Sequence, residues 1–268
     1  MATLKNLHIV EKPSKIEEYI PWLEQKYDFS VNRYKSYYGA TTKLLKENFE
    51  KSDFWNATSN ALRSINDSYI GVSGFPLFSN TECPKVLIKS LDSLIIKSFR
   101  KNILNNPKYP DEPEDGWIGP DNWFTNIKDI LRTTFEVKYI DGVEFLLKEL
   151  DGISQRTGGK YNYSFEARDV GYYAAHSGII LPLEHIDRDW SPKTIDVNVE
   201  IQVTTEIQGI VKNLLHKYYE VNRQKPQKND YLWQWYYKSD EFATNYLGHI
   251  VHYIEGMIVE IRDKQNNK

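Results

Sequence analysis

The stretch VEIQVTT, residues 199–205, alternates apolar and polar side chains and therefore predicts a β-strand. Its apolar residues would share one face of that strand. The opposite face would present the carboxylate of Glu200 beside the amide of Gln202. In an isolated strand, such a polar face usually lies on the protein surface. The segments around this strand favour a different interpretation, in which Glu200 faces a cleft.

Outward from this strand, the chain alternates helical and extended segments. Residues 206–219 predict a helix, and apolar spacing predicts others over 14–50, 87–101, 143–150 and 242–262. Strands are predicted over 133–139, 172–183 and 194–203. This interleaving is typical of an α/β (α+β) domain, with a mixed β-sheet flanked by helices.

Turn-forming residues divide the chain. A cluster of them at 66–84 is expected to separate an N-terminal helical extension, residues 1–84, from a core domain, residues 85–268. A second cluster at 105–122 predicts a long loop, and loops of this length tend to be functional or mobile. A third, glycine-rich cluster at 152–160 predicts a turn.

Composition excludes several classes of protein. The 268 residues carry a net charge of −3, so the chain is not a general binder of polyanions. Mean hydropathy is −0.59, and no apolar run approaches the roughly 18 residues of a membrane span. The single cysteine, Cys83, excludes an internal disulfide and a cysteine-built metal site. Together with the lack of an apolar leader, these features predict a cytoplasmic protein.

Three further blocks accompany the strand at 199–205. They are KSLDSLIIK at 89–97, KDILRTT at 128–134 and RDVGYYAAH at 168–176. In this order, the four blocks resemble the motifs of the RelA/SpoT-type pyrophosphokinases, the alarmone synthetases. The resemblance covers roughly residues 85–220. It implies the synthetase fold of that family, which is nucleotidyltransferase-like, with ATP as a substrate and Mg²⁺ as the cofactor.

The resemblance implies ATP contacts from the first block. The residues concerned are Lys89, Ser93, Lys97 and Arg100, which helical spacing would place on one face. A charged helical stripe is more often simply solvated. The chain also departs from the family here, because Leu87 stands where the family has an arginine two residues before the first lysine.

The resemblance implies catalytic roles for Asp129, Glu200 and Gln202. Asp129 and Glu200 would hold Mg²⁺, which takes hard oxygen ligands and few of them from the protein. Glu200 would alternatively activate the attacking hydroxyl, and Gln202 would orient Glu200 or the acceptor. Without the resemblance, Asp129 would be interpreted as a cap at the start of the strand or an ion pair with Lys128.

The third block implies the acceptor site. Arg168 would bind acceptor phosphates, and the ring of Tyr172 would stack on the acceptor base, since every base offers a π-face. His176 closes the block. A histidine that only orients its strand is an equal interpretation for that position.

The identity of the acceptor is predicted from departures at Thr134 and Thr204, where the family has arginine. A short, synthetase-only chain with these departures is similar to the toxic small alarmone synthetases of toxin–antitoxin systems. The main prediction is transfer of pyrophosphate to the 3′-hydroxyl of the tRNA CCA end, which would inhibit translation, with an antitoxin protein as partner. Candidate tRNA contacts are Lys212, Lys217, Arg223 and Lys225.

Two alternatives stay open. The first is a small alarmone synthetase that makes (p)ppGpp or (p)ppApp from free purine nucleotides. The second is a catalytically inactive module of the same fold that serves as a binding protein. Leu87 and Thr204 favour the inactive module, whereas Lys89, Asp129 and Glu200 argue against it.

Overall fold

The computed structural model describes residues 12–187, 191–223 and 232–266, and only the backbone of 215–223. Contacts within the chain divide it into two compact units. The first comprises residues 1–49, 87–131 and 182–198, and the second comprises residues 50–86, 132–181 and 199–268. The domain boundary predicted between residues 84 and 85 stays a prediction.

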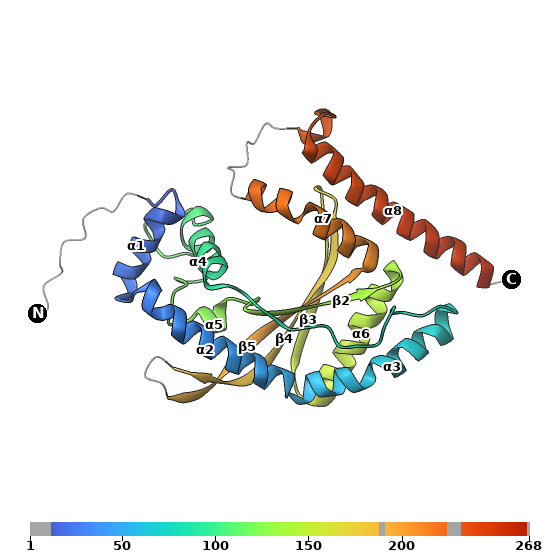
Figure 1. Cartoon of the computed structure of the whole chain (residues 1–268), viewed down its shortest axis with the longest axis horizontal. Helices are drawn as coiled ribbons and strands as arrows, with labels where there is room; N and C mark the ends of the chain where they lie inside the picture. Colours follow the sequence, from blue (N-terminus) through green and yellow to red (C-terminus); the bar gives the residue numbers. More distant parts are fainter. Residues whose placement is uncertain (1–11, 188–190, 224–231, 267–268) are drawn as a thin grey trace, which may run out of the picture. The chain divides into compact units, whose positions relative to one another are not determined.

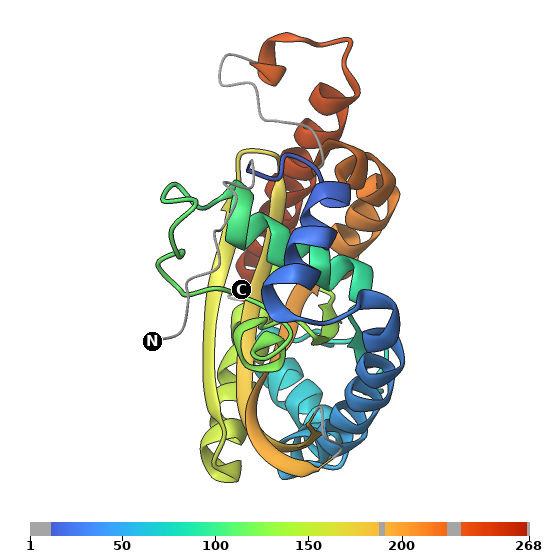
Figure 2. The same ribbon diagram turned by 90° about the vertical axis from the view of Figure 1, so that its left-hand side faces the viewer.

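A five-stranded sheet has the strand order β1-β2-β5-β4-β3. The strands are β1 (Leu87–Ile88), β2 (Leu131–Val137), β3 (Lys160–Arg168), β4 (Tyr172–Ile186) and β5 (Pro192–Thr205). Strands β3 and β4 are antiparallel and lie side by side (Figure 2). The predicted class, a mixed sheet flanked by helices, is confirmed. Strand β3 was absent from the sequence prediction.

Strand β5 contains the deciding stretch 199–205. Its residues Val199, Ile201 and Val203 are fully buried, as the alternation predicts. The interpretation of its other face as a solvated surface is wrong, because Gln202 and Thr204 are only 8% and 5% exposed. Helix α7 (Glu206–Arg223) follows the strand directly, and its Lys212 donates to the side chain of Gln202.

In the first unit, helices α1 (Ile16–Tyr27) and α4 (Leu91–Phe99) pack together. The unit also contains most of α2 (Val31–Glu50), a π-helical turn (Arg100–Leu104) and α5 (Trp123–Asn126). The hydroxyl of Tyr19 lies 2.6 Å from that of Ser98, which joins α1 to α4.

The helix predicted over 87–101 begins later than expected. Leu87 and Ile88 form a strand, and the hydroxyl of Ser90 accepts a hydrogen bond from the backbone of Ser93. Because a serine in this position satisfies an otherwise unpaired N–H of the first turn, the helix starts at Leu91. Lys89 therefore precedes the helix instead of lying on its face.

In the second unit, α3 (Asp53–Ser73) and α6 (Ile140–Thr157) run side by side (Figure 1). Helix α3 was not predicted, and α6 extends beyond its predicted range of 143–150, so the turns expected from residue 66 and from residue 152 start too early. Each helix ends instead at a glycine with positive φ, Gly74 and Gly158. Tyr69, on the last turns of α3, is buried, and its packing keeps the segment helical.

Helices α8 (Asp240–Asn266) and α7 pack together and belong to the second unit, with a short 3-10 turn at Trp233–Trp235. The buried guanidinium of Arg262 joins α8 to α6 and α3. Its Nη2 lies 2.8 Å from Asp141, and its Nη1 lies 2.9 Å from the hydroxyl of Tyr69. No helix in the described part of the chain combines the length and the apolarity of a membrane span.

Candidate functional site

Lys89, Lys97 and Asp129 form one charged cluster in the first unit. The Nζ of Lys89 lies 2.8 Å from Oδ2 of Asp129, and the Nζ of Lys97 lies 2.8 Å from Oδ1. The backbone places these groups: the N–H of Lys89 donates to the carbonyl of Ile130 at 2.8 Å, next to Asp129. Two cations predicted to bind ATP and the predicted metal ligand thus lie together.

Burial and neighbouring charges shift the pKa of Asp129 in opposite directions. Its side chain is 15% exposed. Burial alone would raise the pKa of this carboxyl, but the hydrogen bonds and charges of Lys89 and Lys97 outweigh it and lower the pKa. Asp129 is therefore ionised at neutral pH. Its ion pairs are with these two lysines, and not with Lys128, which was the partner considered for it without the resemblance.

The other two predicted ATP contacts do not join this cluster directly. The hydroxyl of Ser93 accepts a hydrogen bond from Ser90 at 2.8 Å, within the helix cap. Arg100 is exposed at the start of the π-helical turn. Their roles in ATP binding stay predictions.

The predicted acceptor residues meet at the β3–β4 hairpin of the second unit. In the antiparallel register, Arg168 lies opposite Tyr172. The Cζ of Arg168 lies 5.5 Å from the centre of the Tyr172 ring, so the cation lies over the ring that is predicted to stack on a base. Arg168 also pairs with Glu166, two residues earlier on the same strand.

A line of hydrogen bonds joins the acceptor block to β5. The Nδ1 of His176 lies 2.8 Å from Oε1 of Glu200, and the Nε2 lies 2.8 Å from the hydroxyl of Tyr172. Because an ionised carboxylate only accepts, Nδ1 donates to Glu200. In the neutral imidazole, Nε2 then accepts the proton of the Tyr172 hydroxyl. His176 thus connects two predicted site residues, and its role in acceptor binding stays a prediction.

Helix α8 fixes the turn of the β3–β4 hairpin. Gly171 has φ +72°, and a Cβ there would lie 2.2 Å from the carbonyl oxygen of Asn245. A Cβ at Gly248 would lie 2.0 Å from the carbonyl oxygen of Gly171. Only glycine permits this approach of one backbone to the other at both positions. The turn that carries Arg168 and Tyr172 is therefore set by a helix distant in sequence.

A histidine of α8 completes this contact. The Nε2 of His249 lies 2.9 Å from the carbonyl oxygen of Asp169, and its Nδ1 lies 2.8 Å from the hydroxyl of Tyr173. A carbonyl only accepts, so Nε2 donates and Nδ1 accepts from Tyr173 in the neutral ring. His249 therefore binds the turn, in addition to packing.

Of the predicted tRNA contacts, only Lys212 has a described side chain. Lys212 donates to the Oε1 of Gln202 at 2.8 Å, which places it beside the deciding strand. Lys217 and Arg223 lie on helix α7, but their side chains fall outside the described ones, and Lys225 lies outside the described residues.

The carboxylates suit Mg²⁺ by the chemistry of their oxygens. Among the described residues, no three histidine, cysteine, aspartate or glutamate side chains gather as metal ligands. Mg²⁺ typically takes only one or two carboxylates, together with waters and substrate phosphates. A single carboxylate such as that of Asp129 or that of Glu200 therefore suits a metal that arrives with a nucleotide, and not one held permanently by a protein cage.

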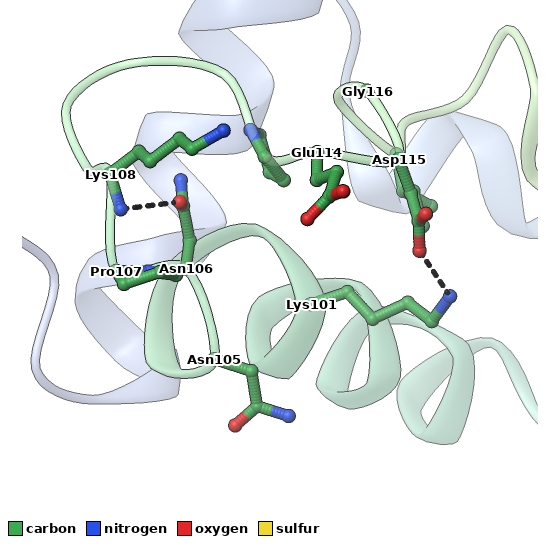
Figure 3. Close-up of a pocket in the computed structure, with 10 residues that line it drawn as sticks. Lys101, Asn105, Asn106, Pro107, Lys108, Glu114, Asp115 and Gly116 are labelled. Atoms are coloured by element: carbon green, nitrogen blue, oxygen red, sulfur yellow. Dashed lines mark hydrogen bonds and ion pairs between the residues drawn. The ribbon is translucent and has the colours of Figure 1, made fainter.

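A pocket of about 340 Å³ lies in the first unit, at the loop predicted over 105–122 (Figure 3). Lys101 reaches across it to Asp115, at 3.8 Å. The side chain of Asn102 holds the loop at Ile118 by two hydrogen bonds. Its Nδ2 donates to the carbonyl of Ile118, and its Oδ1 accepts from the N–H of Ile118. Lys89, Lys97 and Asp129 do not line this pocket.

Two partners of the site were missed by sequence reasoning. Glu166 pairs with Arg168 and lies 3.9 Å from the Nε2 of His176; its two-residue spacing from Arg168 was an available signal. The buried hydroxyl of Tyr38 donates to the carbonyl of Lys89 at 2.7 Å. No local pattern relates residues this far apart in sequence.

Comparison with known proteins bears on the fold. No family model and no curated protein matches the chain. Small alarmone synthetase 2 from Bacillus subtilis matches with a TM-score of 0.52 and 17% identity, over 83% of this chain and 97% of that one. A GTP pyrophosphokinase family protein from Streptococcus pneumoniae matches with a TM-score of 0.51 and 16% identity. That match covers 82% of this chain and 94% of the other one.

A third structure, small alarmone synthetase 1 from Bacillus subtilis bound to its product pppGpp, gives a TM-score of 0.51 and 14% identity. The match covers 81% of this chain and 96% of that one. The chain therefore has the fold of the small alarmone synthetases. At these identities, the likeness concerns the fold.

Proposed function

We propose that the chain is a pyrophosphokinase that transfers pyrophosphate from ATP to a ribose hydroxyl of a free purine nucleotide, with guanosine nucleotides as the first choice. The observation that carries the proposal is the cluster of Lys89, Lys97 and Asp129 within an alarmone-synthetase fold. The solved relative bound to its product pppGpp supports the choice of a free guanosine nucleotide.

On the donor side, the two ammonium groups would turn from Asp129 to the triphosphate of ATP, which carries more negative charge than one carboxylate. Asp129 would hold Mg²⁺, which supplies positive charge against the phosphate oxygens when bound. The lowered pKa of Asp129 keeps its carboxylate ionised and ready for this exchange.

On the acceptor side, the ring of Tyr172 would stack on the purine and Arg168 would bind its phosphates. The acceptor hydroxyl oxygen would bond to the β-phosphorus of ATP, and the bond from that phosphorus to the oxygen of the α-phosphate would break. AMP leaves, and the hydroxyl proton passes to Glu200. The Nδ1–H of His176, 2.8 Å from Glu200, holds this carboxylate in place.

The test follows label from ATP carrying a radioactive β-phosphate. Incubation with GDP or GTP should give a labelled product together with AMP. Asp129→Asn and Glu200→Gln should each lower the rate by about a hundredfold or more, with an unchanged circular dichroism spectrum, because each removes charge but not volume. Asp115→Asn is the matched control, since this exposed carboxylate lies at the pocket of Figure 3, and it should keep full activity.

The same assay tests the acceptor predicted from sequence, the 3′ end of tRNA. Label on tRNA, lost when the terminal adenosine is trimmed, with none on free nucleotides, would overturn the proposal in favour of the tRNA-modifying toxin. An antitoxin partner and a cytoplasmic location would then be examined with it. No label in any acceptor and no consumption of ATP would favour the inactive binding module.

A further inference from the structure

The guanidinium of Arg168 contacts both a carboxylate and an aromatic ring on the β3–β4 hairpin. Its Nη2 lies 2.5 Å from Oε2 of Glu166, and its Cζ lies 5.5 Å from the centre of the Tyr172 ring. Glu166 and Arg168 are two residues apart on β3, so their side chains leave the same face of the strand. The cation that is predicted to bind the acceptor phosphates is therefore already paired with an acid.

The hairpin segment that carries this pair has more acidic than basic side chains. From residue 161 to residue 176, Arg168 is the only lysine or arginine, whereas Glu166 and Asp169 are both acidic. The side chain of Glu166 is 29% exposed, and its Oε2 also lies 3.9 Å from Nε2 of His176. This segment therefore offers one cation, already shared with a carboxylate, to any chain of phosphates that binds there.

We propose that Glu166 is a specificity-determining residue, which makes the acceptor site favour purine nucleotides with fewer phosphates, GMP and GDP over GTP. This inference rests on the proposed function and names the phosphate count of its acceptor. A phosphate that binds Arg168 shares the guanidinium with Glu166. Each further phosphate brings more negative charge toward Glu166 and Asp169, and the segment has no second cation to offset it. Two like charges about 4 Å apart in water repel by an amount equal to roughly a fivefold change in affinity.

A merely structural role for Glu166 predicts a different result. If this carboxylate only oriented Arg168, its loss would weaken every acceptor by the same factor. If it also opposes added phosphates, its loss changes the preference of one acceptor over another. The ratio of kcat/KM for GTP to kcat/KM for GMP separates the two roles, because any effect shared by all acceptors cancels in that ratio.

A competition assay measures this ratio. The full chain is incubated at low salt with β-labelled ATP and equal concentrations of GMP, GDP and GTP, and the labelled products are separated. The natural chain should use GDP about fivefold better than GTP, and GMP at least as well as GDP. Glu166→Gln keeps the size of the side chain and should raise the use of GTP relative to GMP about fivefold or more, whereas Glu166→Asp keeps the charge and should retain the natural order. Glu144→Gln is the matched control, because Glu144 is an exposed acid on α6, paired with Lys148, and its loss should leave the ratio unchanged.

Calorimetric binding of GMP and GTP, without ATP or Mg²⁺, gives the second measurement and does not depend on turnover. The preference for GMP should appear there too, should shrink as salt is added, and should be lost in Glu166→Gln. If the chain binds GMP in preference to GTP but transfers no label, the proposed reaction fails and this inference stands. If it transfers label with a ratio that Glu166→Gln leaves unchanged, or if the natural chain prefers GTP, the inference is overturned and the reaction stands.

Discussion

At the scale of single residues, Tyr172 combines two contacts on one side chain. Its ring lies under Arg168, and its hydroxyl lies 2.8 Å from the Nε2 of His176. The ring is the part expected to stack on an acceptor base, whereas the hydroxyl orients the imidazole that in turn holds Glu200. Two substitutions separate these contributions.

Tyr172→Ala should raise the KM for the acceptor by roughly five- to 150-fold, since stacking is worth about 1–3 kcal/mol per base. Tyr172→Phe keeps the ring and should leave that KM nearly unchanged. It should lower kcat by about fivefold, the value of one hydrogen bond of about 1 kcal/mol. Initial rates with each substrate varied in turn measure both. The KM for ATP is the control, and a parallel rise in it would remove Tyr172 from the acceptor side.

The sequence singles out candidate site residues, whose roles stay predictions, but it does not give their further contacts. The motif blocks single out Asp129, Tyr172 and Glu200, and the structure joins each to another predicted residue. The motif blocks do not identify Tyr38 and Glu166, because the contacts of these residues arise from packing and from strand register. A one-dimensional pattern carries no information on which residue lies opposite another across a hairpin.

At the scale of elements, α8 and the β3–β4 turn depend on each other through two glycines. Gly248→Ala would place a methyl group 2.0 Å from the carbonyl oxygen of Gly171, so one of the two backbones must move. We expect a loss of about 1–3 kcal/mol of unfolding free energy. The KM for the acceptor should rise as well, because Arg168 and Tyr172 flank this turn.

Gly256→Ala supplies the matched control, on the same helix. A Cβ at Gly256 meets nothing within 4 Å, so the variant should gain about 0.5–1 kcal/mol from better helix propensity. Urea unfolding measures both variants. If Gly248→Ala were as stable as Gly256→Ala, the close approach of the two backbones would not exist in solution.

Apolar periodicity predicted some elements, whereas strand β3 and helix α3 were not predicted. Strand β5 follows from its alternation, and α8 from its helical spacing. Strand β3 carries Tyr161, Tyr163 and Phe165 at every second position, so its alternation was present in the sequence although most of its residues are exposed. Helix α3 continues through turn-forming residues because the side chains of Ile65 and Tyr69 are buried on one of its faces. Tertiary packing here overrides the local helix propensity.

At the scale of the whole molecule, one buried carboxyl should set part of the dependence of stability on pH. Glu255 of α8 is 4% exposed and accepts hydrogen bonds from Thr205 and Gln208, both uncharged. Burial raises its pKa, and these two hydrogen bonds only partly oppose the shift. The folded protein therefore holds this proton to a higher pH than the unfolded chain does.

Because the pKa of Glu255 is higher in the folded state than in the unfolded chain, this carboxyl makes the protein less stable as pH rises. Above the folded-state pKa, the folded state carries the full cost of a buried carboxylate, and this cost disappears as pH falls toward the unfolded value of about 4.3. Glu255→Gln should therefore be more stable than the natural chain at neutral pH, with an advantage that shrinks as the solution is acidified. Urea unfolding at a series of pH values measures the difference between the two curves, and a constant difference would contradict the assignment.

The contact between Gly171 and Gly248 also has a consequence for biosynthesis. The ribosome makes the acceptor hairpin well before the helix that fixes its turn. While the intervening residues emerge, β3 and β4 can pair, but Arg168 and Tyr172 lack the backbone that sets their spacing. Nucleotide recognition would therefore be acquired only once residue 248 has left the ribosome, so a nascent chain that is stalled earlier would be unable to select its acceptor.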